Sequence, residues 1–305
     1  MSKTSARTGA NRSSVRNAVA HRRKGFTGET FEAALAGIGR QDAIGLDACS
    51  PGQRSFRALL ALGLFNEGLA AALPGTWGSA RLSTYDPVMS PRWGALVMIV
   101  ERAPDNVTDL LVPDEHQKGV WSVPGLRLLA YTTRGAGTYH LQHEPTGARL
   151  VVTGNPGGPQ PVRGCAVAPW RDARRVGDPL TGAERRALDG LPAMTPDAEV
   201  LLAGLVSRCA LEDRQERWAT SWSWDPLGRL GLSEELRRSR HGERRLWGGR
   251  NTWELTWSGY PWPADLARAL THPVVGVTGA TLHQHRGTCE VTYGSAVLTI
   301  REWLV

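Results

Sequence analysis

Lysine is the residue type that this chain lacks most clearly. Three of its 36 basic residues are lysines, at positions 3, 24 and 118, and the others are arginines. A P-loop requires a lysine directly after a glycine to hold phosphate groups, and protein kinases and pyridoxal phosphate enzymes require a lysine at the reactive centre. None of the three lysines stands in a P-loop or kinase motif. The sequence therefore argues against these three enzyme classes.

Other short catalytic motifs are missing as well. The metalloprotease motif HExxH and the hydrolase motif GxSxG do not occur. The dinucleotide-binding motif GxGxxG begins at Gly135-Ala136-Gly137, but Thr138, Tyr139 and His140 follow without the third glycine. The sequence identifies no catalytic residue, and we expect a binding protein rather than an enzyme.

Cysteine pairs and long apolar runs are also lacking. Cys49, Cys165, Cys209 and Cys289 lie far apart, without the CxxC spacing of zinc and redox sites. The most apolar stretch, residues 58–73, is interrupted by Asn66 and Glu67 and is too short to cross about 30 Å of hydrocarbon. The basic N-terminus is not followed by the apolar segment of a secretory signal. We expect a cytoplasmic protein with reduced thiols, no metal, no cofactor and no membrane contact.

Carboxylates are missing from the first 28 residues, and this absence is the most informative one. The same segment contains seven basic residues: Lys3, Arg7, Arg12, Arg16, Arg22, Arg23 and Lys24. Because the whole chain has a net charge of +7, the remainder is neutral. Residues 1–14 offer almost nothing to bury, so we predict a disordered basic arm over residues 1–24, although Val15, Ala18 and Ala20 indicate a short helix in its second part. Such an arm suits a polyanion, above all nucleic acid.

The rest of the chain has the composition of a globular protein, and its patterns alternate between helix and strand. Apolar residues three and four apart, or an N-cap residue followed by such a pattern, predict helices at 31–38, 51–73, 181–188, 196–217, 233–241 and 264–270. Runs rich in β-branched residues predict strands at 95–100, 126–132, 139–143, 149–153, 253–257, 280–285, 288–293 and 296–301. These patterns predict an α+β fold with small antiparallel sheets and packed helices, preceded by the flexible basic arm.

The length of 305 residues favours two domains over one. Residues 154–169 are rich in glycine and proline and predict a linker between an N-terminal α+β domain at 25–155 and a C-terminal α+β domain at 170–305. A short echo between residues 137–143 and 279–285 raises the alternative that the two halves are related, although so short a match also arises by chance.

The stretch 218–262 combines tryptophan with arginine and is a second candidate surface for nucleic acid. It holds seven of the twelve tryptophans. Aromatic rings stack on unpaired bases while guanidinium groups hold the backbone, so we predict contacts from Arg237, Arg238, Arg240, Arg244, Arg245, Arg250, Trp247 and Trp253. The alternative is that the tryptophans form a packed core under a solvated basic face.

Histidines on a predicted strand offer one candidate metal site. His283 and His285 alternate and would project from one face, where Glu290 or Cys289 of the next strand could join them. Two histidines do not make a site, and exposed strand histidines are common without a metal.

The sequence favours a nucleic-acid-binding, specifically DNA-binding, accessory or regulatory protein that contacts phosphates through the basic arm and the Arg/Trp stretch. Two alternatives remain open. One is an enzyme of the hydrolase or nuclease type, with a site of histidines and carboxylates that only folding brings together. The other is an interaction or structural protein whose arm docks on an acidic protein partner.

Overall fold

The computed structural model describes residues 4–39, 43–66, 87–100, 103–113, 122–132, 135–159, 173–222, 227–228 and 244–302, without the side chains of residues 4–12. These residues form seven helices and three sheets. The α+β class predicted from the sequence is therefore confirmed.

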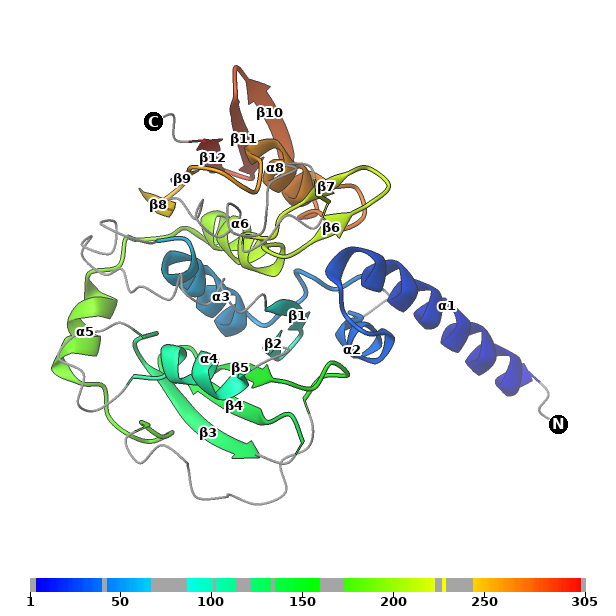
Figure 1. The fold of residues 1–305 in the computed structure, drawn as a ribbon, viewed down its shortest axis with the longest axis horizontal. Coiled ribbons are helices and arrows are strands. Elements are labelled where there is room, and N and C mark those ends of the chain that lie inside the picture. The colour runs from blue at the N-terminus through cyan, green and yellow to red at the C-terminus, as the bar shows by residue number, and fades with distance from the viewer. Residues whose placement is uncertain are drawn as a thin grey trace.

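The chain begins with two helices, α1 (Thr4–Thr27) and α2 (Phe31–Gly37). Residues 4–27 are thus helical, where the composition predicts an irregular arm. The difference has a physical reason, because the segment contains no proline and its last two turns are anchored by the buried residues Ala20, Arg23 and Thr27. α1 stands away from the rest of the molecule at its N-terminal end (Figure 1).

The first half of the body continues with α3, a hairpin, α4 and a three-stranded meander. Its elements are α3 (Pro51–Leu64), β1 (Val88–Arg92), β2 (Ala95–Ile99), α4 (Pro104–Leu111), β3 (Leu126–Thr132), β4 (Thr138–His143) and β5 (Ala148–Thr153). The five strands form sheet 1 in the order β1-β2-β5-β4-β3. All neighbouring strands are antiparallel except β2 and β5, which are parallel.

The second half repeats this plan after the short helix α5 (Gly182–Asp189). Its elements are α6 (Pro196–Ser207), the small hairpin β6 (Glu212–Asp213) and β7 (Trp218–Ala219), then β8 (Arg244–Gly249), β9 (Thr252–Trp257), α8 (Pro263–Thr271), β10 (Thr281–His285), β11 (Thr288–Tyr293) and β12 (Ala296–Glu302). Strands β8 to β12 form sheet 2, in the order β10-β11-β12-β9-β8, with β12 and β9 parallel. The predicted sheets are therefore mixed and not purely antiparallel.

The two halves have the same topology. In each, a helix precedes a hairpin, a second helix follows it, and the last strand of the meander returns parallel to the second strand of the hairpin. The short sequence echo does not mark this repeat. It relates β4 to β10, whereas the strand at the position of β10 in sheet 1 is β3.

Helices α3 and α6 pack against each other between the two sheets (Figure 1). α3 also reaches β8 of the second half, and α6 reaches β1 of the first half, so the contacts are reciprocal, as in a twofold-symmetric dimer. One continuous hydrophobic cluster contains Phe56 and Leu60 of α3, Leu205 of α6 and Trp253 of β9. The halves therefore share a core. The predicted boundary at 154–169 lies partly outside the described residues. Arg174 and Val176 come after this boundary in the sequence, yet they form backbone hydrogen bonds with Leu128 of β3 in the first half.

Alternation along the strands decides which side chains enter this core. In β2, Leu96 and Met98 face α3, whereas Val97 and Ile99 pack with Ala33 of α2 on the opposite face. α2 thus covers part of the second face of sheet 1. The outer face of sheet 2 is polar instead and carries an ion pair between Arg301 and Glu254.

Most predicted elements are confirmed, but two of the helices end well before their predicted ends. The helix predicted at 51–73 begins at Pro51, with Ser50 accepting a hydrogen bond from Gln53 N–H, and ends at Leu64. The helix predicted at 196–217 ends at Ser207, and the hairpin β6–β7 follows it. The polar run 212–217 has no apolar face to bury. Asp213 stabilises the turn because its Oδ1 accepts hydrogen bonds from the backbone N–H groups of Gln215 and Glu216. The helix predicted at 233–241 lies outside the described residues.

Asn66 fastens the end of α3 to the edge strand of the other sheet. Its Nδ2 donates to Leu246 O at 3.0 Å, and its Oδ1 accepts from Leu246 N–H at 3.1 Å. Because the site is buried, replacing Asn66 with alanine should lower the free energy of unfolding by about 2 kcal/mol. Urea titration measures this, with Asn106→Ala on the exposed side of α4 as the control. If both substitutions changed the free energy of unfolding equally, the stabilising role of the hydrogen bonds between Asn66 and Leu246 would be contradicted.

Candidate functional site

The basic residues of α1 fall into two groups. Arg22 and Lys24 are exposed and Arg16 is half-buried, whereas Arg23 is completely buried. Arg7 and Arg12 belong to the same helix, but their side chains lie outside the described residues. The residues of α1 that face solvent carry no carboxylate to offset these cations.

Arg23 forms a closed network with the rest of the protein. Its Nε and Nη2 donate to both oxygens of Glu29, at 2.6 and 2.9 Å. The remaining donors reach backbone oxygens of Gly37, Ile44 and Pro91. Both side chains of the ion pair are fully buried. The predicted role of Arg23 in contacting phosphate is therefore wrong, because every donor direction is used inside the protein.

The helix α1 presents further features that favour an anion. Its first turn contains no acidic residue and its last turn contains Lys24. The N-terminal end of a helix bears the positive end of the backbone dipole, and no described side chain there neutralises it. α1 contacts α2, β1 and β6, and its buried residues Ala20, Arg23 and Thr27 lie in the C-terminal part of the helix.

The Arg/Trp stretch is mostly a core element. Trp253 is 1% exposed and Trp218 and Trp257 are fully buried. Arg244 is also buried and lies over the ring of Trp222, 5.0 Å from its centre. The predicted contacts of Trp253 and Arg244 with nucleic acid are therefore wrong. Trp253 and Trp257 of β9 belong to the core cluster that includes α6 and α8, and Trp218 of β7 belongs to a second cluster, as the alternative of a packed core predicts.

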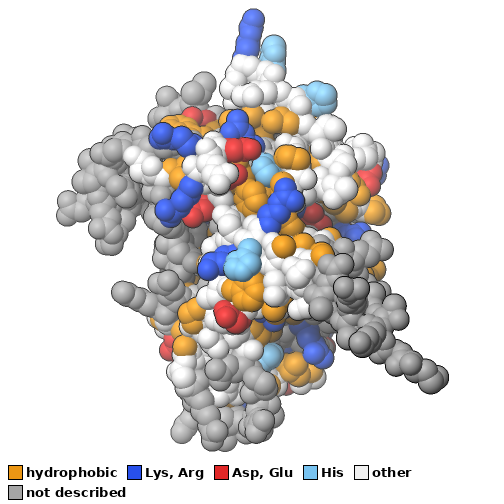
Figure 2. Space-filling view, turned by 90° about the vertical axis from the view of Figure 1, so that its right-hand side faces the viewer, with side chains coloured by type: hydrophobic (Ala, Val, Ile, Leu, Met, Phe, Trp, Pro, Cys, Tyr) orange, Lys and Arg blue, Asp and Glu red, His pale blue; other side chains and the backbone are white. Residues whose placement is uncertain are grey.

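A smaller part of this stretch remains at the surface. Arg245 lies over the ring of Trp247, 4.4 Å from its centre, on the edge strand β8, and both side chains are half-buried. Arg250 is exposed. Arg237, Arg238 and Arg240 lie outside the described residues. On the face of the molecule shown in Figure 2, basic side chains are scattered among acidic, hydrophobic and neutral ones.

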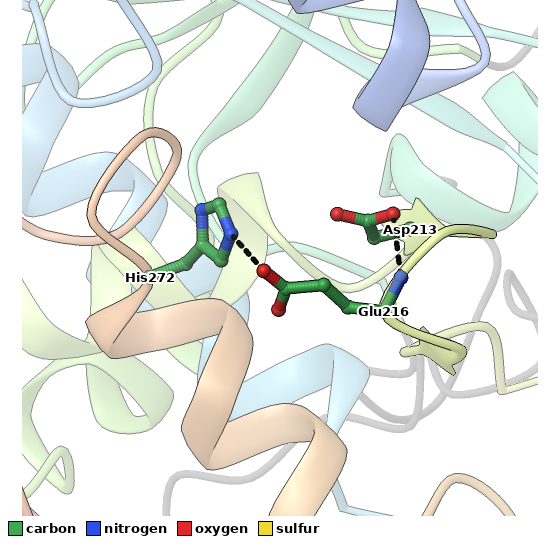
Figure 3. A group of neighbouring side chains, drawn as sticks. All are labelled: Asp213, Glu216 and His272. Atoms are coloured by element: carbon green, nitrogen blue, oxygen red, sulfur yellow. Dashed lines mark hydrogen bonds and ion pairs between the residues drawn. The ribbon is translucent and has the colours of Figure 1, made fainter.

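Folding brings together one group with potential metal ligands that the sequence did not indicate. Atoms of Asp213, Glu216 and His272 lie within 4.8 Å of one another, where the β6–β7 turn meets the end of α8 (Figure 3). His272 is buried between the rings of Phe26 and Trp218, 5.2 and 5.6 Å away. Glu216 is half exposed and accepts a hydrogen bond from Trp218 Nε1.

The hydrogen bonds of His272 decide what this group can do. Its Nδ1 accepts from the backbone N–H groups of Val274 and Val275, at 3.1 and 3.4 Å. The proton of the neutral ring therefore sits on Nε2, which faces Glu216 Oε1 at 3.8 Å. A metal at Nε2 would require the proton on Nδ1, against those two N–H groups. The geometry suits a structural contact between His272 and Glu216 better than a metal site.

The histidines singled out in the sequence lie elsewhere. His283 and His285 are exposed on β10, and Glu290 is the register partner of His283. Cys289 is 1% exposed and belongs to the core, so it cannot join them on the exposed face. The two histidines and Glu290 remain a solvated surface of the sheet.

Within the described part of the chain, no helix combines the length and apolar character needed to span a bilayer. Comparisons of the chain with protein-family models, with curated proteins and with solved structures gave no match. The function is therefore inferred from the geometry of the described residues alone.

Proposed function

We propose that this protein binds nucleic acid, DNA in particular, through the exposed basic residues of α1, and that it acts as an accessory or regulatory protein without catalysis of its own. The observation that supports this most is the separation within α1. Arg23 is buried in the fold, while Arg22 and Lys24 are exposed and Arg16 is half-buried on a projecting helix.

The dimensions of α1 are compatible with this role. Its 24 residues correspond to a length of about 36 Å, close to one turn of duplex DNA. A helix about 10 to 12 Å in diameter fits a major groove about 12 Å wide. Among the described side chains of α1, the buried ones lie in its last two turns, and Val15 is exposed. In this proposal the basic side chains of α1 contact the phosphates of DNA, and the base sequence contributes little to the affinity.

The cysteines support a cytoplasmic location as part of the same proposal. Cys49, Cys209 and Cys289 are buried free thiols, and Cys165 lies outside the described residues. Burial raises the pKa of Cys209 to about 12, so this thiol remains protonated and unreactive at neutral pH. Free thiols of this kind are typical of a reducing compartment.

Charge removal on the exposed side of α1 tests the proposal. The variant Arg16→Gln, Arg22→Gln, Lys24→Gln should bind a labelled DNA duplex more weakly, because fewer condensed counterions are released. The slope of log K against log salt should become less negative by about 0.9 for each phosphate that the variant no longer neutralises, which is about 2 to 3 in total. Fluorescence anisotropy at several sodium chloride concentrations measures both quantities.

The control removes the same charge from other helices. Arg185 and Arg186 of α5 and Arg268 of α8 are exposed, so their replacement by glutamine should leave the salt slope unchanged. Equal losses in both variants would mean that only net charge matters and that α1 is no binding surface. If an acidic protein is the partner of α1 instead, the wild type will bind DNA no better than the α1 variant.

A further inference from the structure

A pocket of about 150 Å³ lies where the two halves of the protein meet, apart from the exposed residues of α1. Asp47 and Cys49 line it from the segment before α3, and Arg54 and Arg57 line it from α3. Its other walls come from α6, from the loop that follows α8, and from β11. The pocket is therefore built by both halves of the repeat.

Arg57 is a buried cation that forms no ion pair with a described carboxylate. It is 1% exposed, and its Nη atoms donate only to backbone oxygens of Leu46, Arg92 and Ala95, at 2.8 to 3.3 Å. Its Nε has no hydrogen-bond partner. Burial lowers the pKa of Arg57 to about 10, so the group remains charged at neutral pH. A buried charge of this kind is costly unless an anion compensates it.

Asp47, the carboxylate in the pocket wall, is already neutralised. Its two oxygens accept from Nη1 and Nη2 of Arg208, at 2.7 and 2.6 Å. Arg208 is fully buried and also donates from Nε to Val275 O at 2.6 Å. This pair fixes α6 to the segment before α3. The charge of Asp47 also favours the charged form of Arg57, but Asp47 forms its ion pair with Arg208.

Arg54 adds a second positive charge to the same pocket. It lies three residues before Arg57 on α3, so the two side chains are neighbours on one face of the helix. No described carboxylate lies within salt-bridge distance of Arg54. Two like charges at this spacing destabilise a helix when nothing bridges them. The pocket is thus lined by two arginines that lack an ion pair with any described residue and by one carboxylate that already has one.

We propose that this pocket binds a phosphate group. The guanidinium groups of Arg54 and Arg57, neither of them ion-paired with a described carboxylate, suit the charge of about −1.5 to −2 that a phosphate monoester carries at neutral pH, and guanidinium is a preferred phosphate ligand. A cavity of this size holds about six non-hydrogen atoms, as a benzene-sized cavity does, and a phosphate group has five. The group belongs either to free inorganic phosphate or to a small phosphate monoester whose remainder lies outside the pocket, beyond the exposed Thr278. This site is independent of nucleic-acid binding by α1.

Calorimetric titration of the full chain tests the pocket with two probes, inorganic phosphate and glycerol 3-phosphate, at ionic strength held constant with sodium chloride. We expect the wild type to bind at least one of them with one site per chain. Arg57 supports three carbonyl groups and its removal endangers folding, so the test uses Arg54→Gln. This variant should bind at least about tenfold more weakly, while Arg54→Lys keeps most of the affinity because it retains the charge.

Three controls separate the alternatives. Arg185→Gln, on exposed α5, should bind phosphate as the wild type does. The variant of α1 that lacks Arg16, Arg22 and Lys24 should also keep its phosphate affinity, so failure of the pocket and failure of the DNA proposal can be told apart. Acetate, which carries one charge, should bind at least about tenfold more weakly than phosphate. The proposal is overturned if neither probe binds, if Arg54→Gln binds as the wild type does, or if acetate binds as tightly as phosphate.

Discussion

Replacing Arg23 with alanine should lower the free energy of unfolding by about 3 to 5 kcal/mol, the largest effect that we expect from a single basic residue of α1. The substitution leaves the carboxylate of Glu29 buried without its cation, because Glu29 is 2% exposed. It also removes the donors from the carbonyl oxygens of Gly37 and Pro91. Urea denaturation at neutral pH measures the change.

Arg22 supplies the matched control for this prediction, because it is the preceding residue and is exposed. Arg22→Ala should change the free energy of unfolding by less than about 0.5 kcal/mol and should weaken DNA binding. The two neighbouring arginines thus have opposite roles, one in the fold and one at the surface. If Arg23→Ala is as stable as Arg22→Ala, the buried network is absent and Arg23 is again a candidate for contacting phosphate.

Acidification should destabilise the protein in two stages, because two buried groups near the start of β3 have lowered pKa values. Burial lowers the pKa of His143 to about 4, and the positive charge of Arg127 acts in the same direction, whereas the hydrogen bond from Nε2 to Pro124 O acts against it. Burial alone would raise the pKa of Glu184, but hydrogen bonds from Arg127 and from backbone N–H groups of Thr181 and Gly125 lower it to about 2. Arg127 and Glu184 form a buried ion pair.

The direction of both effects is the same. His143 is neutral in the folded protein, and the unfolded chain takes up a proton near pH 6.5, so stability falls by about 3 kcal/mol as the pH drops from 6.5 to 4. Glu184 is ionised in the folded protein, and the unfolded chain is protonated near pH 4.5, so a similar loss follows between pH 4.5 and 2. Urea titrations over this range measure the free energy at each pH.

A substitution at His143 separates the two stages. His143→Gln should remove the loss between pH 6.5 and 4 and leave the lower stage, since a glutamine side chain does not titrate and Glu184 keeps its pair with Arg127. Constant stability of the wild type between pH 6.5 and 4 would contradict the assignment of His143 as a buried neutral ring.

Local signals in the sequence predicted the elements well. Ser50-Pro51 and Thr195-Pro196 mark the starts of α3 and α6, because the hydroxyl caps a free N–H and proline fits the first turn. The strands predicted at 139–143 and 149–153 are confirmed as β4 and β5, which pair with each other. The ends of helices were less predictable. Residues 208–217 continue the helical pattern of the sequence, but the chain forms the hairpin β6–β7 there instead.

The candidate sites depend on tertiary contacts that composition does not encode. Arg22 and Arg23 are identical in type and adjacent, and only the position of Glu29 after the turn decides which of them is buried. In the sequence alone, Trp253 looks the same as a tryptophan that stacks on nucleic-acid bases, and only the packing of β9 against α6 and α8 shows that it is a core residue. Arg57 gave one sequence signal that could have been used, a cation inside the apolar face of α3. The topological repeat was hidden because equivalent strands of the two halves differ in sequence.

The salt dependence of DNA binding by the unmodified protein is the most direct measurement of the central claim, that α1 is a surface for phosphates. With three to five cations of α1 engaged, the plot of log K against log sodium chloride concentration should be a straight line with a slope of about −3 to −5. Absence of binding at low salt, or a slope near zero, would contradict it.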